Sequence, residues 1–301
     1  MGRKIVSIGE FMLEMSGGEA DQYRLGYAGD TLNTAWYMRA SLGKEWDVDY
    51  LSALGDDIYS ARMRAFLETH QIGTSHIQTI KNKRPGLYLI HQADGDRHFT
   101  YWRENSAAKQ LADNSAKLAA ALGNCELAYF SGITLAILSR PARENLIFAL
   151  GKARGAGTRV AFDPNIRPVL WPDSNTIREA IIAASPVIDI VLPTFDDDAE
   201  IFGDADPRAT ISRYQGLGIA EVAVKNGAET ALIAQGDNLV EVPALAATAV
   251  DATGAGDSFN GAYLAARLAG QSIETSAQVA HRTAAKVIGH PGALVDPALL
   301  N

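Results

Sequence analysis

The chain has 301 residues, 47% of them hydrophobic and 21% charged, with a formal net charge of −8. This acidic balance disfavours nucleic acid and acidic membrane surfaces as partners, although it does not exclude a local basic pocket for an anionic metabolite. The single cysteine, Cys125, excludes an intrachain disulfide framework and favours a reducing, cytoplasmic location. The sequence has no apolar run near the roughly 18 residues of a membrane span, and its length allows one large α/β domain or two small ones.

The N-terminal part of the chain alternates predicted strands and helices. Strands are expected at residues 4–9, 11–15, 22–27 and 48–54. Gly17-Gly18 is the predicted turn between the second and third of these strands. A polar cluster of Gly29, Asp30 and Asn33 begins a helix that runs to Leu42, and such a cluster can do no more than cap the helix.

Residues 85–103 predict a β-hairpin around Asp94-Gly95, which is a strong two-residue turn signal. Counting outward from this turn gives the pairs Ala93–Asp96, Ile90–Phe99 and Tyr88–Tyr101. Because paired side chains share a face and strands have a period of two, one face carries Tyr88, Tyr101 and Arg103. Two hydroxyls and a guanidinium suit a substrate that carries a carboxylate, and an aromatic ladder beside a solvated arginine is the alternative.

After the hairpin the chain alternates strands with helices, which predicts a mostly parallel sheet. Strands are expected at residues 126–130, 159–162, 187–192 and 221–224. The helix before the second of these strands has Ser139 as its N-cap. Loops at the carboxyl ends of parallel strands bind ligands in doubly wound folds. Asn165 and Arg167 lie in one such loop, and Lys225 and Gly227 lie in another.

An acidic run, Asp196-Asp197-Asp198, follows Thr194 in the loop after the strand at 187–192. Acidic residues are common at a helix start because they face the positive end of the helix dipole. Magnesium keeps several water ligands and binds phosphate oxygens. The other interpretation is therefore that Asp197 contacts the water ligands of the ion rather than the ion itself. The six histidines have no metal-ligand spacing, and no side chain is assigned as a metal ligand.

The stretch from Asp251 to Asp257 lies between a β-prone run with turns at 238–250 and an Ala-rich helix predicted at 257–269. Glycines before a helix leave the first N–H groups unscreened, and the helix dipole makes them a site for an anion. Asp257 at the mouth of this site is either a plain N-cap or a general base facing a phosphoryl group. The phosphate loop G-x-x-x-x-G-K-[ST] does not occur in the chain.

The pattern D-x-x-G-A-G-D at Asp251 to Asp257 resembles the signature of the ribokinase-like (PfkB) carbohydrate kinases, in which the final Asp deprotonates the sugar hydroxyl. The resemblance covers the whole chain. It implies one kinase domain over residues 1–301, with a three-layer α/β core and a mostly parallel central sheet. A small β-sheet lid would come from about residues 11–28 and 84–103.

Several shorter patterns extend the resemblance. Residues 28–33 are similar to the family's G-G-x-x-x-N sugar signature, with Ala28 in place of the first glycine. Residues 97–108 resemble the 2-keto-3-deoxygluconate kinases within this family, in which Tyr and Arg hold the sugar acid. Asp163 to Arg167 is similar to D-x-N-x-R, whereas residues 194–197 depart from the family's N-x-x-E at both ends.

The resemblance implies roles for individual residues. Asp257 would be the catalytic base. The substrate-binding residues would be Gly29, Asp30, Asn33, Tyr88, Tyr101, Arg103, Arg167 and Asp257. The ATP-binding residues would be Asn165, Thr194, Lys225, Gly227, Gly254, Ala255, Gly256 and His281. His281 stands where the family often has Asn near the adenine, and an ordinary histidine on a helix surface is the alternative.

The expected activity is phosphorylation of 2-dehydro-3-deoxy-D-gluconate by ATP with Mg²⁺, giving the 6-phosphate. In this activity Arg103 and Arg167 would form a clamp that holds the substrate carboxylate. Another sugar kinase of the family, such as a fructokinase, needs no such clamp and is the nearest alternative. A non-catalytic sugar-acid sensor and a nucleotide-hydrolysing enzyme are alternatives from other classes. Exposed lid strands favour a homo-oligomer that pairs through them.

Overall fold

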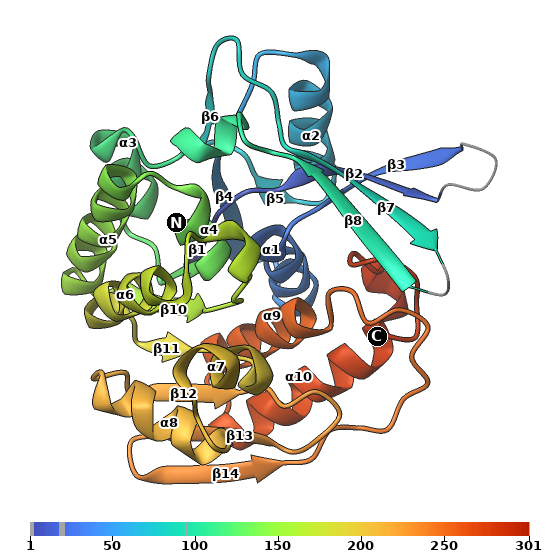
Figure 1. Ribbon diagram of the computed structural model, residues 1–301. Helices are drawn as coiled ribbons and strands as arrows, with labels where there is room; N and C mark the ends of the chain where they lie inside the picture. Colours follow the sequence, from blue (N-terminus) through green and yellow to red (C-terminus); the bar gives the residue numbers. More distant parts are fainter. Residues whose placement is uncertain (1–2, 18–21, 94–95, 301) are drawn as a thin grey trace.

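The computed structural model describes residues 3–17, 22–93 and 96–300, and it has a large sheet between two helical layers with a smaller sheet at one corner (Figure 1). The large sheet has the order β14-β13-β12-β11-β10-β9-β1-β4-β5, with β6 paired to β4. Neighbours from β12 through β5 run parallel, and β13 and β14 are antiparallel additions at one edge. Its strands are β1 (Arg3–Ile8), β4 (Trp46–Leu54), β5 (Ile72–Gly73), β6 (Ile77–Thr79), β9 (Leu127–Ser131), β10 (Arg159–Asp163), β11 (Ile190–Val191), β12 (Glu221–Val224), β13 (Ala231–Gln235) and β14 (Asn238–Val242).

Both faces of the large sheet are buried, as expected for a parallel sheet. In β9, Leu127 and Tyr129 pack into one apolar core while Ala128 and Phe130 pack into the other. The helices that contribute to the first core are α1 (Asp30–Ser41), α2 (Ile58–Thr69), α9 (Ala255–Leu268) and α10 (Ile273–Val287). The helices that contribute to the second are α3 (Ser115–Leu122), α4 (Gly132–Ile137), α5 (Arg140–Gly155), α6 (Ser174–Ala184), α7 (Phe195–Phe202) and α8 (Pro207–Gly216).

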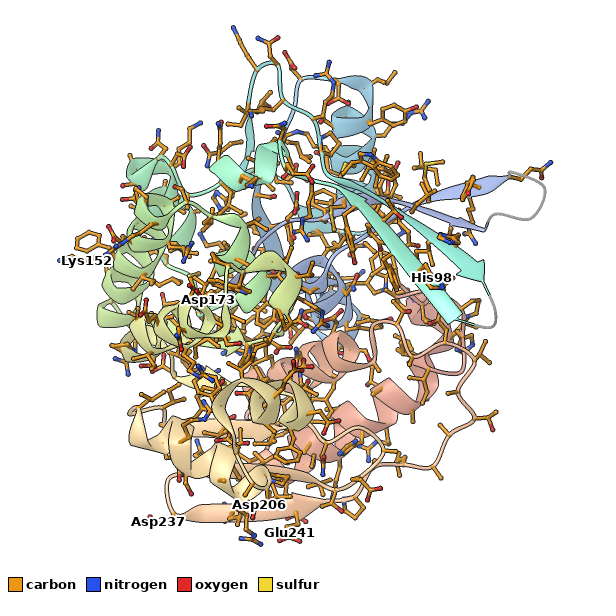
Figure 2. All side chains as sticks on the ribbon, in the orientation of Figure 1. His98, Lys152, Asp173, Asp206, Asp237 and Glu241 are labelled. Carbon is orange, nitrogen blue, oxygen red and sulfur yellow. The ribbon has the colours of Figure 1, made fainter. Side chains whose placement is uncertain are left out.

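Side-chain caps fix where several of these helices begin. Ser139 accepts a hydrogen bond from the Ala142 N–H, which confirms it as the N-cap of α5. Asp173 and Asp206, both labelled in Figure 2, cap α6 and α8 in the same way. Each cap satisfies an N–H group that would otherwise lack an intrahelical partner.

The small sheet is formed by two hairpin-like pairs joined through β2 and β7, which run parallel. Its order is β3-β2-β7-β8, and the two outer pairs are antiparallel. The strands are β2 (Met12–Gly17), β3 (Tyr23–Ala28), β7 (Leu87–Ala93) and β8 (Asp96–Trp102).

The predicted register of the second pair is confirmed at all three positions: Ala93–Asp96, Ile90–Phe99 and Tyr88–Tyr101. The predicted turn Asp94-Gly95 lies outside the described residues, and so does Gly18 of the predicted Gly17-Gly18 turn. Counting outward from the predicted turn therefore identified the correct strand pairing from the sequence.

One predicted strand was too long. The run at 187–192 gives only Ile190–Val191, because Pro186 lies in a 3₁₀ turn at Ser185–Val187. Propensity overestimated this strand because strand length depends on the pairing partner as well as on local sequence. The predicted β-prone run with turns at 238–250 forms a strand at Asn238–Val242.

The parallel strands place their carboxyl ends at one edge of the large sheet, where ligands bind in folds of this kind. Within the described residues, no helix combines the length and apolar character that crossing a membrane requires.

Candidate active site

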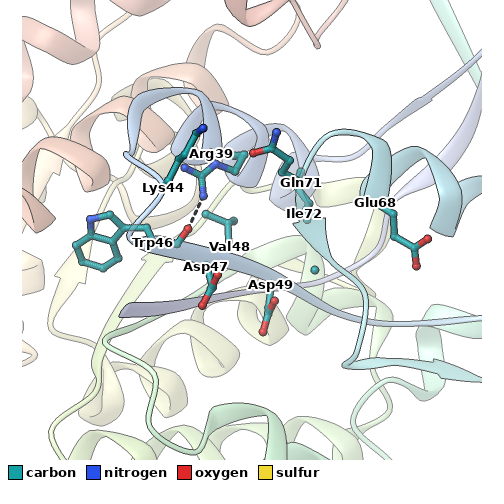
Figure 3. Close-up of a pocket in the computed structure, with 10 residues that line it drawn as sticks. Arg39, Lys44, Trp46, Asp47, Val48, Asp49, Glu68, Gln71 and Ile72 are labelled. Carbon is teal, nitrogen blue, oxygen red and sulfur yellow. Dashed lines mark hydrogen bonds between the residues drawn. The ribbon is translucent and has the colours of Figure 1, made fainter. Parts of the chain in front are cut away.

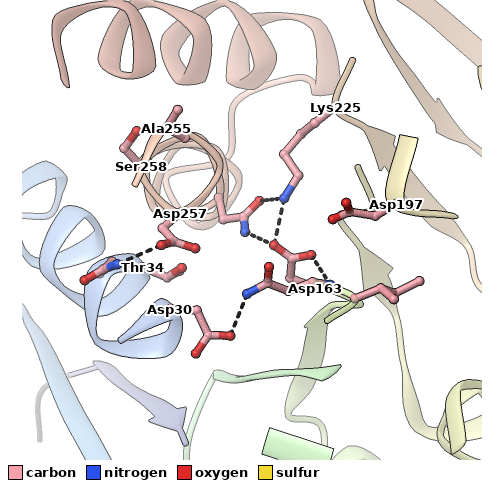
Figure 4. Close-up of polar contacts among 12 residues, drawn as sticks. Asp30, Thr34, Asp163, Asp197, Lys225, Ala255, Asp257 and Ser258 are labelled. Carbon is pink, nitrogen blue, oxygen red and sulfur yellow. Dashed lines mark hydrogen bonds and ion pairs between the residues drawn. The ribbon is translucent and has the colours of Figure 1, made fainter. Parts of the chain in front are cut away.

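Asp257 is the third residue of α9 and points toward the start of α1 (Figure 4). Asn33 donates a hydrogen bond from Nδ2 to Asp257 Oδ2 at 2.8 Å. The N-cap of α9 is Gly254, so the interpretation of Asp257 as a plain N-cap is wrong. The carboxylate is instead held by a side chain from a distant helix, which leaves it to face the space between α1 and α9.

Burial raises the pKa of Asp257 to about 7, and the nearby carboxylates of Asp30 and Asp163 act in the same direction. The hydrogen bond from Asn33 and the charge of Lys225 act in the opposite direction. A general base works best when its pKa lies near the operating pH. Asp257 therefore has the proton affinity that a base needs for deprotonating a hydroxyl at neutral pH.

The two glycines before Asp257 have different backbone conformations. Gly254 has φ of 77°, a left-handed conformation, and a Cβ there would lie 2.9 Å from the Ala293 carbonyl oxygen. Gly256 is helical, and the nearest described atom to a Cβ there would be Lys225 Nζ at 3.6 Å. Gly254 is thus required by the turn, whereas Gly256 leaves open space beside an ammonium group.

Ala255 uses its N–H within this turn, donating to the Ala252 carbonyl at 3.2 Å. Gly256 and Asp257 follow in the first helical turn, where N–H groups have no carbonyl one turn earlier in the helix to bond to. Asp251 stabilises the turn, because its carboxylate accepts hydrogen bonds from the N–H groups of Thr253 at 2.9 Å and Gly292 at 2.7 Å. Of the N–H groups predicted to bind an anion, that of Ala255 is therefore engaged within the turn, and the anion site itself stays a prediction.

A buried polar network lies next to this turn (Figure 4). Lys225 donates to Asp163 Oδ2 at 2.7 Å and to Asn260 Oδ1 at 3.1 Å. Asn260, one turn after Asp257 in α9, donates to the same Asp163 oxygen at 2.6 Å. Lys225 thus presents a fixed positive charge close to Gly256, and it is held there by residues from β10 and α9.

Gly29 and Asp30 form the start of α1 against the end of β1. A Cβ on Gly29 would lie 2.5 Å from the Glu10 carbonyl oxygen, so only glycine fits this close approach. Asp30 accepts from Asn165 Nδ2 at 2.8 Å, and burial raises its pKa. Asn165 itself has φ of 35°, a left-handed conformation that Asn tolerates better than most residues.

Tyr88, Tyr101 and Arg103 lie together at the end of the small sheet nearest the core. The rings of Tyr88 and Tyr101 are 5.6 Å apart, and Tyr88 donates a hydrogen bond to Glu14. Arg103 is ion-paired with Glu10, and its side chain is only 12% exposed. The alternative of a solvated arginine is therefore wrong for Arg103.

Arg167 approaches the same region from the loop after β10. It is ion-paired with Asp197 at 3.3 Å, and this pair is partly exposed. Burial raises the pKa of the Tyr101 hydroxyl, while the charges of Arg103 and Arg167 oppose that shift. The charges of Arg103 and Arg167, the two arginines predicted to bind the substrate, therefore act on the same hydroxyl group.

The remaining predicted ATP residues lie farther along the carboxyl edge. Thr194 is the N-cap of α7 and forms a β-bridge with Lys225. Gly227 follows with φ of 57°. His281 is only 7% exposed and packs edge-on against Phe259, so the alternative of a surface histidine is wrong. Burial lowers the pKa of His281.

The acidic run after Thr194 divides into two roles. Asp197 faces Arg167, whereas Asp198 is buried behind it and accepts hydrogen bonds from Arg213 and Tyr214, each at 2.7 Å. All three aspartates lie in the first turn of α7, which confirms the interpretation as a helix start.

Four residues of this region had no assigned role from sequence: Glu10, Glu14, Asp163 and Asn260. Glu10 follows β1 and Asp163 ends β10, so their position at strand ends was the available signal. Asn260 lies one helical turn after Asp257, on the same side of α9. Glu14 faces Tyr88 only because β2 pairs with β7, a pairing that local sequence does not reveal.

A separate pocket of about 600 Å³ lies at the amino end of β4 (Figure 3). Arg39, Asp47 and Asp49 are among its lining residues, and Arg39 donates to the Trp46 carbonyl. The amino ends of parallel strands lie at the edge opposite their carboxyl ends. This pocket is therefore remote from Asp257.

Comparison with known proteins agrees with this geometry. The model of the pfkB family carbohydrate kinases matches residues 3–298. Proteins named 2-dehydro-3-deoxygluconokinase from Escherichia coli (strain K12) and Dickeya dadantii (strain 3937) are 39% and 38% identical to this chain. The alignments cover 98% of this chain and 98% of the first relative, and 97% of each for the second.

A solved structure of a putative ribokinase II from E. coli, in complex with ATP and Mg²⁺, superposes with a TM-score of 0.84 at 22% identity. The match covers 98% of this chain and 95% of that one, and it establishes a shared ribokinase-like fold. With the family model matching nearly the whole chain, this protein belongs to the pfkB family of carbohydrate kinases.

Proposed function

We propose that this kinase transfers the γ-phosphoryl group of ATP to the 6-hydroxyl of 2-dehydro-3-deoxy-D-gluconate. The observation that carries the proposal is the pair of arginines, Arg103 and Arg167, whose charges both act on the Tyr101 hydroxyl. Asp257, with a pKa of about 7, supplies the base. A sugar acid needs both a cationic clamp and a base at its far hydroxyl. The names of the relatives at 38–39% identity support the same substrate.

In this mechanism Asp257 takes the proton of the 6-hydroxyl as its oxygen attacks the γ-phosphorus, and the bond to the leaving ADP oxygen breaks. Asn33 holds the carboxylate in position through its 2.8 Å hydrogen bond. The N–H groups of Gly256 and Asp257, with Lys225 beside them, stabilise charge on the transferring group. The substrate contacts would be Gly29, Asp30, Asn33, Tyr88, Tyr101, Arg103 and Arg167.

ATP would lie along the carboxyl edge on the other side of Asp257. The residues proposed to contact it are Asn165, Thr194, Lys225, Gly227, Gly254, Ala255, Gly256 and His281. Lys225 and the open space at Gly256 suit phosphate oxygens, because a Cβ on Gly256 would lie 3.6 Å from the Lys225 ammonium and meet no other described atom within contact distance.

Mg²⁺ fits this donor set as a companion of the nucleotide. Among the described residues, no group of three or more His, Cys, Asp or Glu is arranged to hold a metal ion. Magnesium in kinases is bound largely by phosphate oxygens and water, with one or two carboxylates. Asp197, partly exposed beside Arg167, is the side chain best suited to reach its water shell, and the ion would offset phosphate charge.

We further propose that the whole chain is one kinase domain in which the small sheet acts as a lid over the substrate. In the order of that sheet, β3 and β8 are the edges, and they carry the exposed apolar side chains Tyr23, Leu25, Phe99 and Trp102. Pairing of these edges between subunits would give a homo-oligomer. Light scattering after gel filtration tests the oligomeric state. The need for ATP supports a cytoplasmic location.

A coupled assay of ATP turnover tests the activity. We expect turnover with 2-dehydro-3-deoxy-D-gluconate, much less with D-fructose, and little without a sugar. A preference for D-fructose would make the protein a fructokinase-like enzyme. Turnover without sugar would make it a nucleotide hydrolase, and binding of the acid without turnover would make it a sensor.

A further inference from the structure

Among the described residues, Arg103 has one buried counter-charge. Its Nη2 is paired with Glu10 Oε2, and the exposed fractions of the two side chains are 12% and 1%. An unpaired guanidinium is strongly disfavoured at such burial, since its hydration is lost without compensation. Glu10 therefore supplies the counter-charge that holds Arg103 at this place.

Glu10 stands where the core and the small sheet meet. It follows β1 of the large sheet and precedes β2 of the small one, and its backbone carbonyl abuts Gly29. A Cβ on Gly86 would lie 2.9 Å from Glu10 Oε1, so the glycine at that position leaves room for the carboxylate. The pair thus fixes the end of β8 against the core.

The contact between the two side chains is made at one point. Among the described residues, neither Glu10 Oε1 nor Arg103 Nε has a hydrogen-bond partner, although both atoms are buried. A two-point pair between carboxylate and guanidinium would have used the second carboxylate oxygen, Oε1. Buried polar atoms without partners are uncommon and often mark functional sites.

The second clamp arginine is held differently. Arg167 is paired with Asp197 at 3.3 Å, and the exposed fractions of these side chains are 49% and 34%. Water can solvate Arg167 if that pair opens, so its position does not depend on Asp197 to the same degree. Of the two clamp arginines, Arg103 is the one whose position requires its carboxylate partner.

We propose that Glu10 is a positioning residue for the sugar-acid clamp: it holds Arg103 toward Tyr101 and Arg167 so that the guanidinium meets the substrate carboxylate. This inference rests on the proposed function. Glu10 itself touches neither the substrate nor the transferring phosphoryl group, and its effect passes through Arg103.

The test is Glu10→Ala, measured as KM for 2-dehydro-3-deoxy-D-gluconate, KM for ATP and kcat. We expect KM for the acid to rise roughly tenfold or more, as for loss of a charge-assisted hydrogen bond, while kcat and KM for ATP stay near wild type. Glu10→Gln keeps an acceptor oxygen and should rescue part of the loss. A fall in KM for the acid would overturn the proposal, because Glu10 would then only offset the charge of Arg103.

A matched control is Glu126→Ala, which breaks a Glu–Arg pair with Arg3 that is exposed on both sides. It should change none of these constants. An equal rise in KM in this control and in Glu10→Ala would overturn the positioning role.

A double variant keeps the test decisive if Glu10→Ala does not fold. In the Arg103→Ala background, adding Glu10→Gln should leave kcat/KM for the acid unchanged, because Glu10 has no arginine to act through. A further loss would show that Glu10 acts independently and would overturn the proposal. Failure of the proposed function looks different, since wild type itself would then not phosphorylate the acid.

Discussion

Asn33 in α1 holds Asp257 in α9 through a hydrogen bond of 2.8 Å between residues 224 positions apart in the chain. The bond joins the helix that follows β3 of the small sheet to the helix that follows the glycine turn. In the proposed mechanism, the substrate-binding residues of α1 and the phosphate-binding turn before α9 meet at this carboxylate. Several expected outcomes depend on this arrangement.

The pH dependence of kcat/KM should report Asp257. Because its pKa is raised to about 7, the base is protonated and inactive below that pH. We expect kcat/KM for the sugar acid to fall about tenfold per pH unit in the acidic limb, with an apparent pKa near 7. A profile that stays flat down to about pH 5 would contradict the role of Asp257 as the base.

Asp257→Asn should separate activity from stability. Turnover should drop by roughly 10²–10⁴-fold, the usual contribution of a general base. The wild-type carboxyl has a pKa raised from 3.8, so the folded state binds more protons and wild-type stability declines as pH rises from about 4 to 7.

Asn removes this penalty, so the variant should melt higher than wild type at pH above about 7, and the difference should vanish near pH 4. Thermal unfolding across this range measures it. Near-normal turnover in the folded variant would remove Asp257 from the mechanism.

Gly254→Ala should lower stability, whereas Gly256→Ala should leave stability unchanged and impair catalysis. Gly254→Ala combines a left-handed backbone with a contact of 2.9 Å to the Ala293 carbonyl, so it should lower the free energy of unfolding by about 1–3 kcal/mol. Gly256→Ala meets its nearest described neighbour at 3.6 Å and should fold normally.

The methyl group of Gly256→Ala would stand beside Lys225, where the phosphates are expected, so KM for ATP should rise and kcat should fall. Chemical denaturation and steady-state kinetics on both variants distinguish these effects. Wild-type kinetics for Gly256→Ala would mean that the phosphates bind elsewhere.

Arg103→Ala and Arg167→Ala should both reduce kcat/KM for the sugar acid by roughly ten- to a hundredfold. A neutral sugar that wild type accepts should be affected far less, because it never uses the clamp. Arg→Lys should restore only part of the loss, since an ammonium cannot make the planar two-point contact. Equal losses on both substrates would assign the arginines to phosphate or to structure.

The same two variants should differ in stability. Arg103→Ala leaves Glu10 buried without its partner and should destabilise the fold by about 3–5 kcal/mol. Arg167→Ala breaks a partly exposed pair and should change stability by at most about 1 kcal/mol. Urea unfolding of both variants checks this, and equal destabilisation would contradict the difference in burial.

The sequence by itself determined the features that depend on local pattern. The turn signal at Asp94-Gly95 and the period of two fixed the pairing of Tyr88 with Tyr101. The glycines before Asp257 predicted a helix start at this point, and α9 begins at Ala255, because tight turns and helix starts are specified by adjacent residues. The role of Asp257 as the base came from the resemblance to the carbohydrate kinases and stays a prediction.

Only the tertiary structure decided which partners the charged residues have. Glu10 pairs with Arg103, 93 positions away, and Asp163 pairs with Lys225, 62 positions away. The sequence around each residue therefore does not reveal its partner. The burial of His281 is likewise set by packing between α9 and α10. Local signals fix the conformation of a segment, whereas burial and charge pairing arise when distant segments exclude water from the same place.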